Sequence, residues 1–235
     1  MLIAVLLAIQ PVEILAKLEA KYSRIGSLSM TVTHTIEKPV ERSERWRYIF
    51  RSPDKFRIEM SRPEKRILVS NGTRLWEYLP AGNAAMLTDL GKLDAAERTR
   101  TLNATLGRVS VKGLSLPHGT LQAPRLLAEK DGTVEVEATV REKKQTLRAT
   151  IDAARLLLLK TELMDQGGNV LTTTEAFDPE EVSRDFWIVR RIRVRTMLAP
   201  VVEERYILAD VEVNQDVEAE KFEFTPPESA RVERR

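Results

Sequence analysis

Hydrophobic and polar residues alternate along most of the chain, which predicts β-strands with one covered and one exposed face. The alternation is clear in residues 27–37 (SLSMTVTHTIE) and 45–51 (RWRYIFR). After a turn at Ser52-Pro53-Asp54 it continues in residues 55–60 (KFRIEM). One side of these strands is apolar and aromatic and the other is polar or charged, as in an antiparallel sheet that is covered on one side.

The segment ILVSNGTRLWEYLP, residues 67–80, predicts a β-hairpin. Asn71-Gly72 separates two apolar runs, and Asn-Gly favours the type I′ turn, in which both central residues have positive φ. Further strands are predicted at 133–140, 145–152, 155–164, 170–177, 186–197 and 202–214, with a turn at Gly167-Gly168-Asn169.

Two segments have helical spacing instead. Residues 12–25 place Val12, Leu15, Leu18 and Tyr22 on one face and end at Gly26. Residues 94–109 have a similar pattern, and a loop rich in Pro and Gly then leads to a short predicted helix at 125–130. The expected fold is mainly β with helices (α+β): about eleven strands in a strongly curved sheet, or a barrel that is not closed, with helices on its apolar side.

The first ten residues, MLIAVLLAIQ, form the most apolar segment of the chain. They are too few to span a membrane, which needs about 20 residues, and they lack the basic residues that begin a signal peptide. Residues 1–10 nevertheless resemble an abbreviated export signal, since Pro11 separates them from the amphipathic pattern that follows. The alternative is the first turn of a buried helix.

Composition removes several classes of function. Of the 235 residues, 37 are Lys or Arg and 35 are Asp or Glu, so the net charge is only +2 and nucleic acid is not expected as a partner. The chain has no Cys, which excludes disulfides, thiolate metal sites and lipid attachment through Cys.

Enzymatic signatures are missing as well. The sequence has no phosphate-binding glycine loop, nucleophile elbow or metalloprotease motif. Of the two histidines, His34 is expected to be a hydrogen-bonded interior residue and His118 lies in the Pro-Gly loop. The basic run 189–195 (VRRIRVR) fits the exposed face of a strand or, alternatively, a docking surface for an acidic partner. We therefore expect a protein without catalytic residues, metal or cofactor.

Large apolar side chains are the remaining candidates for function, and we expect them on one face of the sheet. They are either an ordinary core beneath the helices or the wall of a cavity for an apolar ligand. The nine candidates are Met30, Trp46, Tyr48, Phe50, Phe56, Ile58, Met60, Trp76 and Tyr78.

The run FRSPDKFRIEMSRPEKRILVSNGTRLWEYLP, residues 50–80, resembles the core motif of the periplasmic outer-membrane lipoprotein carrier family (LolA). Its features are a turn with Pro, an extended strand and a hairpin of the form LVS-N-G-x-x-L-W-x-Y-x-P. The ending KFEFTPPESARV, residues 221–232, is similar to that family's closing segment. The resemblance spans nearly the whole chain, so residues 11–235 are expected to be a single domain of this kind.

The resemblance implies an unclosed antiparallel β-barrel with an apolar concave face beneath a helical lid. It also implies a periplasmic carrier that takes the acyl chains of lipoproteins from an inner-membrane transporter and passes them to an outer-membrane acceptor. A monomer that binds acylated lipoproteins or lipids is expected. Binding of the acyl chain is favourable because each CH₂ group kept out of water contributes about 0.8 kcal/mol.

One position departs from the family pattern. Family carriers usually have Arg directly before the turn Pro, where it holds the lid, but here Ser52 stands there and Arg51 comes one residue earlier. Arg51 is thus a candidate lid contact, although its strand position points to the opposite face. The alternative function is a carrier-like regulatory sensor that binds a membrane partner such as an anti-sigma protein.

Overall fold

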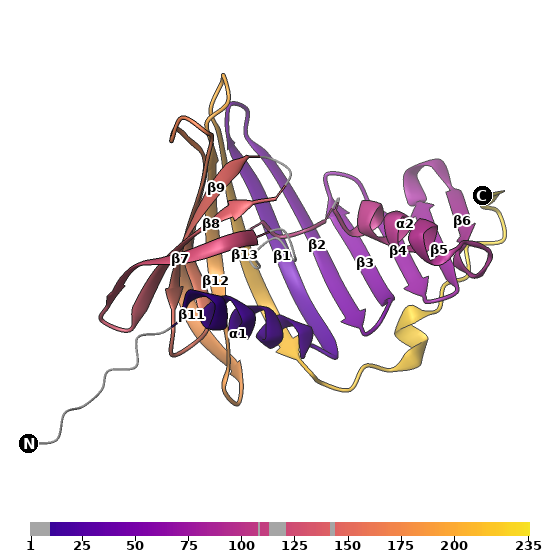
Figure 1. Cartoon of the computed structure of the whole chain (residues 1–235). Helices are drawn as coiled ribbons and strands as arrows, with labels where there is room; N and C mark the ends of the chain where they lie inside the picture. Colours follow the sequence, from indigo (N-terminus) through magenta and orange to yellow (C-terminus); the bar gives the residue numbers. More distant parts are fainter. Residues whose placement is uncertain (1–9, 108, 113–120, 142–143) are drawn as a thin grey trace, which may run out of the picture. The chain divides into compact units, whose positions relative to one another are not determined.

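The computed structural model describes residues 10–107, 109–112, 121–141 and 144–235. Residues 1–9, which carry most of the expected export signal, and His118 lie outside this part. The described chain contains fourteen strands and two α-helices (Figure 1). They are α1 (Pro11–Ser23), β1 (Ser27–Lys38), β2 (Arg42–Arg51), β3 (Lys55–Arg62), β4 (Arg66–Asn71), β5 (Arg74–Leu79), β6 (Ala84–Asp89), α2 (Ala95–Gly107), β7 (Leu121–Lys130), β8 (Thr133–Val140), β9 (Gln145–Asp152), β10 (Leu157–Met164), β11 (Val170–Ser183), β12 (Phe186–Thr196), β13 (Val202–Val213) and β14 (Arg231–Arg234).

The chain divides into two compact units. The first comprises residues 1–24 and 112–203, and the second comprises 25–111 and 204–235. In the second unit the strands are hydrogen-bonded in the order β14-β6-β5-β4-β3-β2-β1-β13, and in the first in the order β12-β11-β10-β9-β8-β7. The edge strands β7 and β14 do not pair with each other, so the fold is the mainly antiparallel, unclosed β structure with helices that the sequence predicted.

Three strands were not predicted, which raises the count from about eleven to fourteen. The segment of β6 (AAMLTD) lacks strong alternation. The segment of β7 includes the expected helix 125–130, but its Leu- and Ala-rich sequence pairs with β8 as a strand. The last strand, β14, is fully exposed and forms by parallel pairing with β6.

In the first unit, α1 packs across β8, β9 and β10 (Figure 1). Ile14 and Leu18 are buried against these strands, with Leu15 and Tyr22 at the margin. Val12, expected on the packed face, is 63% exposed. The packed face of the helix is therefore centred one residue away from the line of apolar residues that the sequence predicted.

Lys21 fixes the end of α1 to this unit. Its ammonium donates hydrogen bonds to the backbone carbonyls of Arg155 (3.3 Å), Leu156 (3.0 Å) and Trp187 (2.5 Å). The side chain is buried, and this desolvation lowers the pKa of Lys21 from 10.5 to about 8, although the charge of Asp152 opposes the shift.

In the second unit, cross-strand register fixes which residues share a face. Val32 pairs with Trp46, and Trp46 pairs with Met60. Directly opposed residues point to the same side, so these pairs define an aromatic face, whose residues are Met30, Trp46, Tyr48, Phe50, Phe56, Ile58 and Met60. The other side, which carries Arg45, Arg47, Arg57 and Glu59, is the charged face.

The low pKa of Lys21 can be measured directly. In a ¹³C-lysine NMR titration we expect one resonance, absent from Lys21→Arg, with a midpoint near pH 8. Between pH 8 and about 10.5 the unfolded chain keeps the Lys21 proton that the folded chain has lost, so the free energy of unfolding rises with pH. Compared with the Lys21→Met variant, this rise is up to about 1.4 kcal/mol per pH unit. A Lys21 midpoint at 10.5 would contradict this account.

Candidate ligand-binding face

The register brings seven of the nine candidate residues together. Across β2 and β3, Tyr48 faces Ile58 and Phe50 faces Phe56, while Met30 on β1 faces Tyr48. The rings of Tyr48 and Phe50 are stacked, with centroids 6.4 Å apart and planes inclined by 5°. The predicted apolar wall is thus continuous over β1, β2 and β3.

Burial divides this wall into two groups. Met30, Trp46, Phe56 and Ile58 are buried, and such side chains would hold the sheet together whatever the function. Tyr48, Phe50 and Met60 are only partly buried. Burial still raises the pKa of the Tyr48 phenol to about 12, so Tyr48 stays uncharged at neutral pH.

Trp76 and Tyr78 lie on the charged face, contrary to the expectation of a shared face. In the hairpin of β4 and β5, Trp76 pairs with Val69 and Tyr78 with Ile67. Val69 in turn pairs with Arg57 of the charged face. The hairpin itself was predicted correctly, but β4 is apolar on both faces, so its pattern does not indicate on which side Trp76 and Tyr78 lie.

The turn of this hairpin differs from type I′. Ser70 pairs with Leu75, so residues 71–74 form the loop, and of the Asn-Gly pair only Gly72 has a positive φ (94°). The Asn71 side chain accepts hydrogen bonds from the backbone N–H groups of Thr73 (3.1 Å) and Arg74 (2.9 Å). Asn71 therefore makes a side-chain-stabilised turn.

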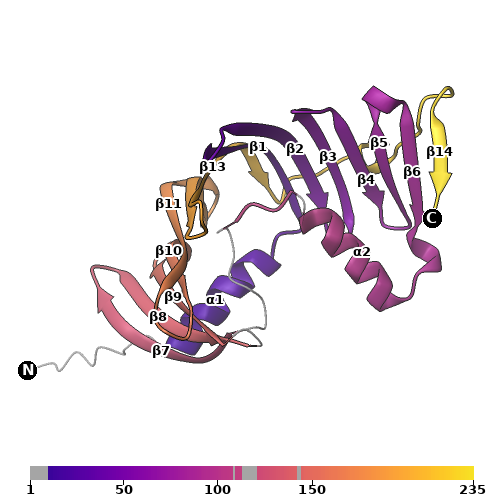
Figure 2. The ribbon, with the colours of Figure 1, turned by 90° about the horizontal axis from the view of Figure 1, so that it is seen from above.

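The C-terminal segment, residues 214–230, covers Trp76 and Tyr78. The ring of Phe224 lies 6.0 Å from that of Trp76 and 5.7 Å from that of Tyr78. The neighbouring Phe222 is 1% exposed. Figure 2 shows this yellow segment on the opposite side of the sheet from α2. These two aromatic residues therefore hold the C-terminal segment.

Arg51 also binds the C-terminal segment. Its guanidinium donates to the carbonyl of Val217 (2.8 Å) and lies 5.4 Å from the centre of the Phe222 ring. The structure thus contradicts the expected contact of Arg51 with a lid, because its odd-numbered strand position places it on the charged face.

The helix α2 lies over the aromatic side of β4, β5 and β6 (Figure 2). Asp94 and Glu97 form a capping box at its start: the Glu97 N–H donates to Asp94 Oδ1 (2.8 Å) and the Asp94 N–H to Glu97 Oε2 (3.3 Å). None of the thirteen residues of α2 is buried. A cavity of about 230 Å³ separates the helix from the sheet, lined by Leu68, Leu75, Glu77, Met86, Thr88, Thr101, Ala104, Thr105 and Arg235.

Arg98 is the lid contact that sequence reasoning missed. From α2 it donates to the carboxylate of Asp54 and to the carbonyl of Gly72 (2.5 Å). A Cβ on Gly72 would lie 2.8 Å from Asp54 Oδ1, so glycine is needed for the two turns to approach. Asp54, the carboxylate directly after the turn Pro, could have indicated that a basic residue binds at this turn.

A polar cluster interrupts the aromatic face. The His34 Nε2 is hydrogen-bonded to Glu204 (2.9 Å), and its ring stacks on Tyr206 at 4.4 Å. This is the hydrogen-bonded histidine that the sequence predicted. The indole N–H of Trp46 is buried without an acceptor among the described residues.

The described residues contain no group of three or more His, Asp or Glu side chains that could hold a metal ion. Neither described helix has the length and apolar composition needed to span a membrane.

Similar folds occur among solved structures. A domain from Vibrio parahaemolyticus named as an outer membrane lipoprotein-sorting protein has a TM-score of 0.59 at 13% identity, covering 90% of this chain and 95% of its own. A LolA superfamily protein from Nitrosomonas europaea has a TM-score of 0.57 at 15% identity, covering 92% and 99%. This chain has a LolA-like fold.

A further protein with a similar fold is a DUF1329 family protein from Desulfovibrio piger, with a TM-score of 0.61 at 14% identity and coverage of 92% and 98%. No family model matches the sequence, and no curated protein does. The LolA-like fold agrees with the resemblance in residues 50–80 and 221–232.

Removing the Arg98 contact should loosen α2. We expect amide exchange in residues 95–107 of Arg98→Met to be about fivefold faster, the equivalent of about 1 kcal/mol for a partly exposed ion pair. The control is Arg100→Met, because Arg100 hydrogen-bonds only within its own helix, to the Ala96 carbonyl at 3.4 Å. Equal exchange in the two variants would show that Arg98 does not hold the helix.

Proposed function

We propose that this protein is a periplasmic carrier, formed by residues 11–235, that binds acyl chains of lipoproteins or related lipids on the aromatic face. The observation that carries the proposal is the contrast between this face and its cover. Tyr48, Phe50 and Met60 offer soft apolar contacts, while α2 contributes no buried residue. A cover that Arg98 ties to the sheet and that buries none of its own residues can move aside for a ligand.

The chemistry of the face suits an acyl chain. Met and aromatic side chains adapt to a ligand without a fixed shape. The unpaired indole N–H of Trp46 costs free energy while it lacks an acceptor. The ester or amide carbonyl of an acylated ligand would supply one.

The fold supports a carrier role rather than catalysis. The similar structures include one named for outer membrane lipoprotein sorting, and the proposal extends that role to this chain. In it, an inner-membrane transporter supplies the cargo and an outer-membrane acceptor receives it.

Extraction of the purified protein tests this function. The protein is isolated from periplasm without detergent and its bound lipids are identified by mass spectrometry. We expect about one acylated lipoprotein or equivalent lipid per chain. An empty protein that also fails to take up a synthetic diacylated lipopeptide would overturn the proposal, and an empty protein that retains a membrane-protein partner would favour the regulatory sensor instead.

A substitution on the aromatic face tests its part in binding. We expect Phe50→Asp to weaken binding of a fluorescent diacylated lipopeptide about 10- to 100-fold, because burial of a Phe side chain is worth roughly 1.5–3 kcal/mol. Phe50 suits the test because it is only partly buried, so its replacement disturbs the core less than that of Trp46 or Phe56.

The matched control is Phe177→Asp, since Phe177 on β11 is 38% exposed. It should bind the lipopeptide like the unmodified protein, and far-ultraviolet circular dichroism should show the same sheet content for both variants. Unchanged affinity in a folded Phe50→Asp protein would place Phe50 outside the site.

A further inference from the structure

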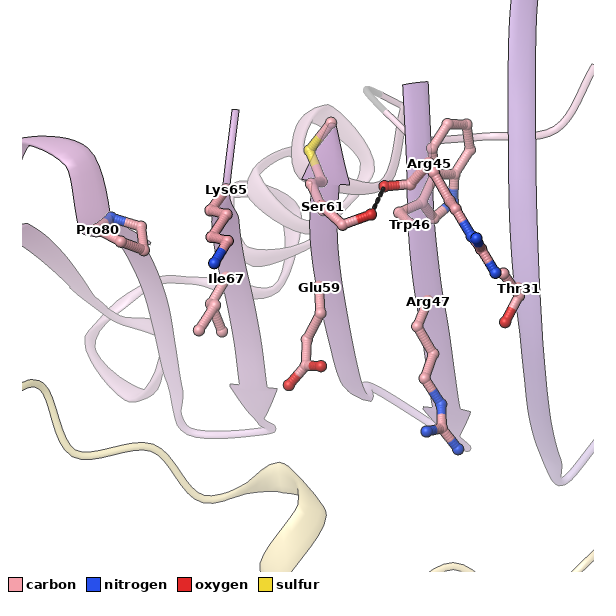
Figure 3. Close-up of a pocket in the computed structure, with 10 residues that line it drawn as sticks. Thr31, Arg45, Trp46, Arg47, Glu59, Ser61, Lys65, Ile67 and Pro80 are labelled. Carbon is pink, nitrogen blue, oxygen red and sulfur yellow. Dashed lines mark hydrogen bonds between the residues drawn. The ribbon is translucent and has the colours of Figure 1, made fainter. Parts of the chain in front are cut away.

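A groove of about 420 Å³ lies beside the charged residues Arg45, Arg47 and Glu59, and Trp46 and Met60 of the aromatic face also line it (Figure 3). It crosses β2, β3 and β4 and reaches the end of β5. The side chains that matter for recognition are Arg45, Arg47, Glu59, Lys65, Ile67 and Pro80. The groove therefore combines charged groups with apolar side chains.

Positive charge in the groove is not neutralised locally. Arg45, Arg47 and Lys65 are exposed, and within the described part of the chain none of them forms an ion pair. The carboxylate of Glu59 is already engaged by Arg57 at 2.6 Å. Three cations are thus available to an anionic partner.

The same face already binds one acidic segment, its own C-terminal segment, in which Ala219–Phe222 form a short 3-10 helix. Residues 215–224 (QDVEAEKFEF) carry four carboxylates and one Lys. Arg51 donates to the Val217 carbonyl (2.8 Å), and Arg57 donates to the carbonyls of Lys221 (3.4 Å) and Glu223 (3.5 Å). Phe222 anchors the segment by complete burial.

The groove continues this binding surface along the same strands. Arg47 and Arg51 lie on one face of β2, and Arg57 and Glu59 on the same face of β3. In Figure 3 the yellow C-terminal segment passes below Arg47 and Glu59. In the groove, Arg45, Arg47 and Lys65 repeat the kind of donors that hold the segment.

We infer that this groove is a docking site for an acidic peptide segment of a partner protein. Its cations pair with carboxylates and carbonyls of the segment, and Ile67 and Pro80 contact an apolar side chain. A peptide segment is favoured over a membrane surface because this face already holds one through arginine donors.

The test uses a fluorescein-labelled peptide that copies residues 215–224. We expect saturable binding to the full chain that weakens with added salt. Charge reversal of the groove, in the variant Arg45→Glu/Lys65→Glu/Arg47→Glu, should weaken it about tenfold or more, since three exposed ion pairs together are worth about that factor. The neutral peptide with Asn and Gln in place of Asp and Glu should bind equally poorly to both proteins.

The matched control makes the same change in net charge on exposed cations of the first unit: Lys17→Glu/Lys130→Glu/Arg184→Glu. It should keep full peptide affinity, and both triple variants should still take up the fluorescent lipopeptide. Peptide affinity that is equal in the two variants overturns the inference, because binding would then arise from displacement of the C-terminal segment or from net charge. Binding of phosphatidylglycerol vesicles without binding of the peptide also overturns the inference.

Discussion

A sheet of this size has two faces, and the second unit depends on how each of them is covered. Because successive side chains of a strand point to opposite sides, each residue contributes to only one face of the sheet. The strand β4 shows the consequence most clearly: Leu68 and Val69 are each 1% exposed although they point to opposite sides. Both faces must therefore be shielded from water, and the protein uses a different element for each.

The two covers differ in strength. On the charged face the C-terminal segment inserts Phe222 completely, packs Phe224 against Trp76 and Tyr78, and continues into β14 beside β6. On the aromatic face α2 leaves a cavity and is held through Arg98. Buried aromatic packing is worth several times as much as a half-exposed ion pair, so the helix is the cover that can open.

The sequence predicted the fold well where one face of a strand is polar. In β1, β2 and β3 the alternation identified the strands and seven residues of the aromatic face. The prediction of the faces failed where alternation is absent. The apolar run Ile67-Leu68-Val69 does not indicate on which side of the sheet Trp76 and Tyr78 lie. The contact that holds α2 was not predicted either, because Arg98 and Asp54 are 44 positions apart and only the folded structure brings them together. Arg51, whose strand position already pointed away from the helical side, contacts the C-terminal segment.

The division of the sheet also separates the two proposed binding events. Arg47 and Tyr48 are neighbours in the chain, yet one lines the groove and the other the aromatic face. The separation is incomplete at one place, because Trp46 and Met60 of the aromatic face also line the groove. Asp54, which receives Arg98, lies in the turn between Arg51 of β2 and Arg57 of β3, and both of these arginines hold the C-terminal segment. The same turn therefore carries contacts of both covers.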